Sequence, residues 1–207
     1  MKIKIYNALT IIVLSSFCLF SCAKKTIQNT SANIPEVIVQ PFPKKAITKD
    51  SFPFSWFGTW EGTLDIYNAK GLSQSIPMSL ELGATDTVGY YKWHIIYGAD
   101  RAKGIRPYYL KTIDASKGHY LNDEKNSIKM EAYLLGGKLF STFSVEGNLL
   151  TSMQEKVGDT MIWEIVFGKE KEVSITGNQV VKGDTISAVK TMPVIISQRA
   201  TLKRKKS

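Results

Sequence analysis

Period-two alternation of apolar and polar residues, repeated along residues 52–203, is the feature that most constrains the fold. Between Trp56 and Ile66, even-numbered apolar or glycine positions alternate with Thr59, Glu61 and other polar residues. The same alternation recurs in runs separated by short turns such as Gly136-Gly137. Alternation with this period is typical of β-strands that bury one face, and short turns join antiparallel neighbours.

About ten strands are expected, with no convincing amphipathic helix. Weaker strands are predicted over residues 172–181 and 186–192, and a longer one over 194–203. Consecutive hairpins without long crossovers favour an up-and-down barrel over a sandwich. The predicted fold class is therefore all-β, an antiparallel up-and-down barrel of about 8–10 strands.

The N-terminus predicts export and anchoring. Lys2 and Lys4 precede an apolar run from Ala8 to Phe20, which is shorter than the ~20 apolar residues a membrane span needs. The run Leu19-Phe20-Ser21-Cys22 resembles the lipobox of bacterial lipoproteins. That resemblance implies a signal peptide over residues 1–21, cleavage before Cys22, and lipidation of its sulfur. An ordinary signal peptide or an uncleaved N-terminal helix is the alternative.

Residues 22–51 read as a flexible tether, because they are polar, spaced by prolines, and lack sustained periodicity. Lys24 and Lys25 stand where surface-exported lipoproteins of Bacteroidetes-type bacteria often have acidic residues. The expected location is therefore the bacterial cell envelope, lipid-anchored in the outer membrane and facing the periplasm. Acyl chains on Cys22 would make the membrane a partner.

The net charge of +9 does not indicate a nucleic-acid partner. Signal, tether and the basic tail over residues 204–207 hold most of the excess, whereas residues 52–202 carry equal numbers of basic and acidic side chains. A neutral domain offers no implied basic face. Both cysteines, Cys18 and Cys22, precede the predicted domain, so the domain has no disulfide or cysteine-based metal site.

The stretch Phe57-Gly58-Thr59-Trp60 resembles the opening strand of lipocalins and fatty-acid-binding proteins, grouped as calycins. In those barrels the tryptophan closes one end beneath an arginine from the last strand. The resemblance therefore implies barrel closure by Trp60 and Arg199. The longer pattern also resembles nitrobindins, but no histidine follows Tyr120 to ligate haem, so no cofactor and no metal are expected.

Aromatic residues on the apolar faces are the candidate ligand contacts, because hydrophobic pockets are usually lined by such rings with a few polar groups. The candidates are Trp93, Tyr91, Tyr97, Phe143 and Trp163. The same rings would equally well fill a solid core.

No recognisable catalytic motif is present, so no catalytic residue is assigned. Alternation places Glu61, Asp65 and Glu164 opposite the tryptophan-bearing faces. The first hypothesis is a lipid-anchored barrel that binds or shields a small hydrophobic ligand without catalysis. The second is a packed barrel acting as an interaction partner in an envelope assembly, and the third is a carboxylate-dependent hydrolase or isomerase.

Overall fold

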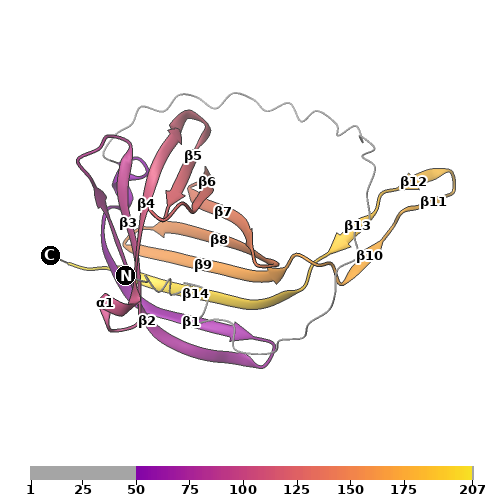
Figure 1. Ribbon diagram of the computed structural model, residues 1–207, viewed down its shortest axis with the longest axis horizontal. Coiled ribbons are helices and arrows are strands. Elements are labelled where there is room, and N and C mark those ends of the chain that lie inside the picture. Colours follow the sequence, from indigo (N-terminus) through magenta and orange to yellow (C-terminus); the bar gives the residue numbers. More distant parts are fainter. Residues whose placement is uncertain (1–49, 207) are drawn as a thin grey trace, which may run out of the picture. The chain divides into compact units, whose positions relative to one another are not determined.

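A computed structural model describes residues 50–206, and its core is a closed antiparallel barrel of ten strands (Figure 1). Each strand pairs with its neighbour in sequence except at the closure, where β1 pairs with both β2 and the last strand. This confirms the predicted up-and-down barrel. Its strands are β1 (Gly58–Asn68), β2 (Gly71–Ala84), β3 (Tyr90–Tyr97), β4 (Ile105–Asp114), β5 (His119–Asp123), β6 (Lys129–Leu135), β7 (Lys138–Val145), β8 (Asn148–Val157), β9 (Thr160–Lys169) and β14 (Val194–Arg204).

The segment between β9 and β14 forms an arm outside the barrel (Figure 1). It consists of two short two-stranded sheets: β10 (Ser174–Thr176) with β13 (Val189–Thr191), and β11 (Gln179–Val181) with β12 (Asp184–Ile186). The strand predicted over residues 172–181 is interrupted at Gly177, and the one predicted over 186–192 is interrupted between β12 and β13. Gly177 and Gly183, the latter between β11 and β12, adopt left-handed backbone conformations. All twelve strand residues of the arm are exposed, since they lack a continuous apolar face to bury.

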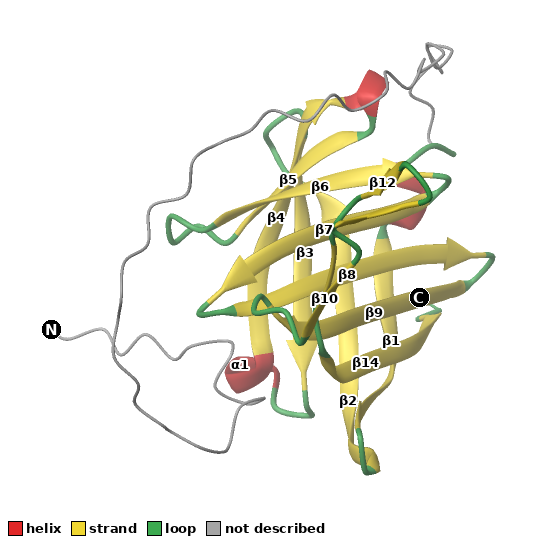
Figure 2. Ribbon diagram, turned by 90° about the vertical axis from the view of Figure 1, so that its right-hand side faces the viewer, coloured by secondary structure: helices red, strands yellow, loops and turns green. Residues whose placement is uncertain are grey.

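Helical structure in residues 50–206 is limited to three short segments, η1 (Phe54–Trp56), α1 (Arg101–Gly104) and η2 (Ala115–Lys117) (Figure 2). Asp100 and Asp114 cap α1 and η2 by accepting hydrogen bonds from backbone N–H groups of the first turn. None of these helices has the length and apolar character needed to cross a membrane.

The core lies inside the barrel, where the inward residues of each strand are two apart. Trp60 and Leu64 of β1, Leu80 of β2, and Ala200 and Leu202 of β14 are all buried to 1% exposure or less. Their neighbours in sequence point to solvent, as the alternation predicts.

Gly62 allows β1 and β14 to close the barrel tightly. The two strands pair with Trp60 opposite Arg204 and Gly62 opposite Leu202. A Cβ atom on Gly62 would lie 2.5 Å from the carbonyl oxygen of Thr201, which is backbone and cannot move aside. The second glycine of the GTWEGTL stretch is therefore required by the close approach of the last strand.

The residues Lys44–Ser207 form one compact unit that contains all ten barrel strands and their pairing. A fragment beginning at Lys44 thus carries the complete barrel. β14 continues to Arg204, one residue beyond the predicted end of the domain at residue 203. The predicted signal peptide, Cys22 and nearly all of the tether lie outside the described residues.

Candidate functional site

One end of the barrel is closed by Trp60 beneath an arginine of the last strand. The guanidinium carbon of Arg204 lies 4.1 Å from the centroid of the Trp60 ring, in a cation–π contact. Arg204 also donates hydrogen bonds to the carbonyl oxygens of Phe57 and, at 3.1 Å, Ser55. The indole N–H of Trp60 donates to the carbonyl oxygen of Trp56 at 2.9 Å. Together these contacts attach η1 across the end of the barrel.

The predicted closing arginine, Arg199, is the wrong residue. It pairs with Asp65 across the β1–β14 ladder, on the outer face, and its Nε lies 3.4 Å from Glu164. The physical reason is the alternation of side chains along β14. Trp60 faces inward and pairs with Arg204, so the even-numbered residues of β14 face inward. Arg199 is odd-numbered and therefore faces solvent. In the sequence, the apolar residues Ala200 and Leu202 already indicate that the even-numbered positions of this strand face inward.

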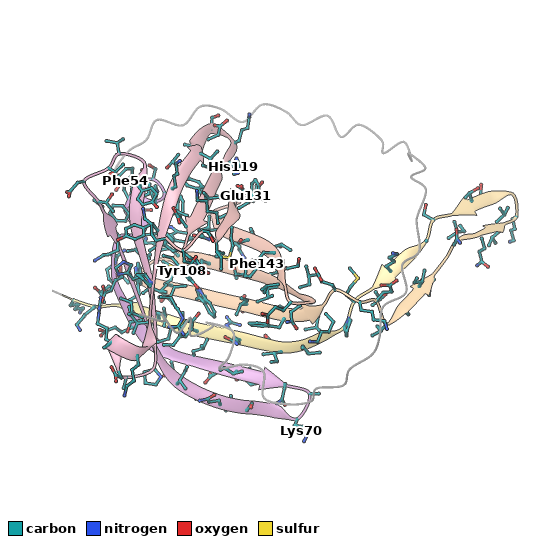
Figure 3. All side chains as sticks on the ribbon, viewed as in Figure 1. Phe54, Lys70, Tyr108, His119, Glu131 and Phe143 are labelled. Carbon is teal, nitrogen blue, oxygen red and sulfur yellow. The ribbon has the colours of Figure 1, made fainter. Side chains whose placement is uncertain are left out.

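Aromatic rings fill the closed end behind η1. The ring of Phe52 makes edge contacts with Trp56, Trp93 and Tyr120, at centroid distances of 4.7, 5.9 and 4.9 Å. Burial raises the pKa of Tyr120 to about 12. In Figure 3, Phe54 lies at this end, away from Lys70 in the β1–β2 turn.

Two of the five predicted pocket residues belong to this closed end. Trp93 is 1% exposed, and its indole N–H donates to Oε1 of Gln154, on the far wall, at 3.1 Å. Tyr91 packs against Phe54 and Phe57 of the η1 segment. Both residues face inward as predicted, but they fill the closed end of the barrel.

The other three predicted pocket residues, Tyr97, Trp163 and Phe143, lie farther from η1. Tyr97 is the last residue of β3, and its ring meets Trp163 of β9 across the interior with centroids 6.2 Å apart. Phe143 comes from β7, opposite Leu150 of β8 (Figure 3). Their contact with a ligand stays a prediction.

The end of the barrel opposite η1 is accessible to solvent. Several inward-facing side chains there are partly exposed, whereas Trp60, Trp93 and Leu202 at the closed end are at most 1% exposed. The partly exposed residues are Ile66, Ile76, Tyr97, Arg106, Met130, Phe143 and Ile196. We call this the open end.

Several polar groups that the sequence interpretation did not single out face the interior. Arg106 and Tyr108 pair with Ile95 and Trp93 across the β3–β4 ladder, and both partners are buried inward-facing residues. Residues paired directly in an antiparallel ladder share a face, so Arg106 and Tyr108 also point inward. Gln198 of β14 is 1% exposed. Alternation in β4 and β14 would have identified all three.

Two buried hydrogen-bond donors of the interior have no partner in residues 50–206. They are the indole N–H of Trp163 and the amide nitrogen of Gln198. Trp163 pairs with Ala200, two residues from Gln198 on the same face of the sheet, so the two side chains are diagonal neighbours. Buried polar groups are almost always hydrogen-bonded, so each unpartnered donor requires an explanation.

The three strand carboxylates face outward, as the alternation predicts, so they do not form a catalytic pair inside the barrel. Glu61 accepts from Lys205 at 2.8 Å, and Asp65 accepts from Ser75 at 2.5 Å. Glu164 lies beside Arg199. Glu61 and Asp65, together with Arg199 and Lys203, line an open depression of about 340 Å³ on the outer wall over β1 and β14.

Both histidines also lie outside the barrel interior. His94 packs near Glu81, and burial lowers the pKa of its imidazole below the usual 6.5. His119 stacks on Tyr133 and contacts Glu131 through Nε2 at 2.5 Å (Figure 3). No group of three histidine, cysteine or acidic side chains that could hold a metal ion occurs in residues 50–206.

Comparisons with known proteins identify fold-level likenesses only. No model of a known protein family matches the sequence, and no curated protein matches it. One similar solved structure is the S-type phycobiliprotein lyase CPES from Guillardia theta, with a TM-score of 0.45 and 10% identity over 73% of this chain and 89% of that one. Another is a variant of the fluorescent protein UnaG, with a TM-score of 0.40 and 13% identity over 73% and 97%. At these values the likenesses carry no argument about function.

Proposed function

We propose that the barrel binds a small hydrophobic ligand through its open end, without catalysis. The observation that carries this proposal is the pair of unpartnered donors, on Trp163 and Gln198, buried in an interior that is closed at one end by Trp60 and Arg204 and reached by solvent at the other. Aromatic rings with a few convergent polar groups are the usual lining of a ligand site.

The proposal includes a lipid anchor at Cys22 and a place in the bacterial cell envelope, with the domain facing the periplasm. Its support is the leader sequence: a basic start, a short apolar run and the Leu19-Phe20-Ser21-Cys22 pattern. An anchored, open-ended barrel would hold a poorly soluble molecule near the membrane that supplies or receives it. Labelling cells with a radioactive fatty acid, and comparison with Cys22→Ser, tests the anchor.

A second candidate, an interaction module, is favoured by the arm. Apolar side chains of the arm are exposed, including Val173 at 65% and Val180 at 69%. Isolated two-stranded sheets are marginally stable in water, so a partner that covers them would be stabilising. A hydrolase or isomerase has weaker support, since Glu61, Asp65 and Glu164 lie on the outer wall with partners of their own.

Binding of a neutral fluorescent probe tests the first candidate. The fragment Lys44–Ser207 is titrated with N-phenyl-1-naphthylamine, whose emission rises in an apolar site. Ile196→Trp places a large ring inward at the open end, and we expect it to weaken binding about tenfold or more, by occupying the space that the probe needs. Ser197→Trp, its outward neighbour, should leave the affinity unchanged.

Native mass spectrometry of the same fragment, purified from its own cell envelope, gives a second readout. A bound mass that is lost on denaturation supports the binding barrel. Absence of both a bound mass and probe uptake contradicts it and favours the interaction module.

A further inference from the structure

The outer wall over β1 and β14, two strands that lie side by side (Figure 1), carries a polar depression that faces away from the barrel interior. Its volume of about 340 Å³ lies at the lower end of the range for small-molecule sites, roughly 300–1,000 Å³. Among the residues that line it, Tyr67 is the one aromatic residue and is 41% exposed. The other lining residues are one glycine, two threonines and four charged residues.

The two threonines lie at the centre of the depression. Thr63 of β1 pairs directly with Thr201 of β14, so their Cα atoms are about 4.5–5.5 Å apart and both side chains point outward. Within the part of the chain that the structure describes, neither hydroxyl makes a hydrogen bond. A threonine hydroxyl both donates and accepts, so this pair offers both functions to a bound molecule.

A pair of opposite charges lies on each side of the threonines. Glu61 is opposite Lys203, and Asp65 is opposite Arg199. Opposite charges that face each other across an antiparallel ladder commonly attract and stabilise the sheet. Yet the two members of each pair do not come within ion-pair distance of each other, although both strands are fully described.

The four charged groups instead contact side chains that lie outside the depression. These contacts are Glu61 with Lys205 at 2.8 Å, Asp65 with Ser75 at 2.5 Å, Arg199 with Glu164 at 3.4 Å, and Lys203 with Thr160 at 2.7 Å. The charged heads are therefore drawn apart, and the space above the two threonines stays open. Acceptors from β1 lie along one side of this space and donors from β14 along the other.

The lining selects against most classes of ligand. Its two carboxylates and two cationic groups balance, so an anion meets the carboxylates and a cation meets the arginine and lysine. An apolar molecule would remove charged groups from water without replacing their hydrogen bonds, which is costly. A neutral molecule with many hydroxyl groups has none of these costs, because each hydroxyl can donate to a carboxylate or accept from a cation.

Tyr67 supplies the one ring face at the end of the depression. The pairing of β1 with β2 shifts register between Ile66 and Tyr67. Irregularities of this kind bend a strand and re-aim its side chains, and they are frequent beside binding sites. The C–H face of a sugar ring is apolar, so it can pack on an exposed tyrosine ring while the hydroxyls at its edge form hydrogen bonds.

We propose that this depression binds a neutral oligosaccharide. One sugar ring packs on Tyr67, and the hydroxyls of the next ring form hydrogen bonds with Thr63 and Thr201, between the carboxylates of β1 and the cations of β14. The site is separate from the ligand site proposed for the barrel interior, because the two lie on opposite faces of the same strands. It adds a second partner, a glycan chain, to the function of this protein.

Binding of sugars of matched length and different charge tests the proposal. The fragment Lys44–Ser207, labelled with ¹⁵N, is titrated with the neutral cellotriose and chitotriose and with the anionic trigalacturonic acid. We expect at least one neutral sugar to shift the amide signals of Thr63 and Thr201 saturably, and the anionic sugar to bind about tenfold more weakly. Raising the salt from about 0.05 to about 0.5 M should leave the affinity for the neutral sugar unchanged, because it carries no charge to screen.

Variants then locate the contacts. The double variant Thr63→Val and Thr201→Val removes both hydroxyls but keeps β-branched side chains of similar shape, so the strands are retained. It should reduce the affinity for the neutral sugar about tenfold, and Tyr67→Leu should do the same. Thr142→Val, on the outer wall of β7, removes a hydroxyl elsewhere and should change nothing.

Three results would overturn the proposal: no saturable shift with either neutral sugar, tighter binding of trigalacturonic acid, or an affinity that the threonine and tyrosine variants leave unchanged. Glycerophosphoethanolamine, a zwitterion, is titrated in parallel. Shifts with this molecule but with neither sugar would reassign the depression to a zwitterionic ligand. Uptake of N-phenyl-1-naphthylamine by the same fragment reports on the barrel interior, so the failure of either site is distinguishable from that of the other.

Discussion

Replacement of Arg204 by methionine should destabilise the barrel by about 3 kcal/mol. Methionine keeps an unbranched apolar chain over Trp60 but removes the guanidinium. The cation–π contact contributes about 2 kcal/mol when desolvated, and each hydrogen bond to Phe57 and Ser55 about 1 to 2 kcal/mol. These contributions total about 4 kcal/mol at the least when the contacts are desolvated. The side chain is 29% exposed, which weakens the cation–π contact, so we expect a loss of about 3 kcal/mol. Asp159 adds little, because it is 88% exposed.

Urea unfolding of the fragment Lys44–Ser207, followed by tryptophan fluorescence, measures this loss. With a slope of about 2 kcal/mol per molar urea, the midpoint should fall by about 1.5 M. Arg199→Met is the matched control, since it removes the same group from an exposed pair with Glu164 and should cost at most about 0.5 kcal/mol. A Cβ on Gly58 would lie 2.6 Å from Nη1 of Arg204, so Gly58→Ala should cost less in Arg204→Met than alone.

The reasoning is refuted if the two arginine variants shift the midpoint equally, or if Arg204→Met costs less than about 1 kcal/mol. Either result would mean that the buried Trp60 and the rings behind η1 close the barrel without help from the last strand.

Three further predictions concern the wall of the barrel. Gly62→Ala should cost about 2 to 3 kcal/mol in urea unfolding, because its Cβ meets the backbone of β14, whereas Gly83→Ala meets only a flexible lysine chain at 3.6 Å and should cost nothing. Gln154→Leu should cost about 1 to 3 kcal/mol by leaving the buried indole N–H of Trp93 without an acceptor, again by urea unfolding. The pKa of His94 is lowered by burial, so the unfolded chain binds a proton more readily; stability is full above the usual 6.5 and falls as pH drops through it. Thermal melts from pH about 7.5 to 5.5 should show this fall, and His94→Gln should reduce it.

The barrel could be predicted from sequence because one pattern determines most of it. Alternation of buried and exposed residues identified the inward faces of β1, β3 and β9, and hence Trp60, Trp93 and Trp163. It also correctly predicted that Glu61, Asp65 and Glu164 face outward. The strand boundaries were predicted less well over residues 172–192. The β-branched residues there favour strands, but they do not alternate with polar residues to form an apolar face that the barrel could bury.

Arg199 was chosen for its position near the end of the chain and for the resemblance to calycins, against the parity of its own strand. The residues Ile196, Gln198, Ala200 and Leu202 alternate as the inward face, and the next inward position is Arg204. The basic residues at the end of the sequence look like a solvated tail. Arg204 belongs to this run, but it pairs with Trp60 and so helps to close the barrel.

The polar members of the inward face were missed for a related reason, and they decide the chemistry. An inward polar residue between apolar neighbours contradicts the pattern that identifies a strand, so it is easily set aside as noise. A buried amide on β14 and a guanidinium on β4 both lower the stability of a solid core, since each must be desolvated. A barrel selected only for packing would replace them with apolar side chains of similar volume. Arg106 and Gln198 are therefore better explained by the ligand-binding function proposed above than by the packing of the core that surrounds them.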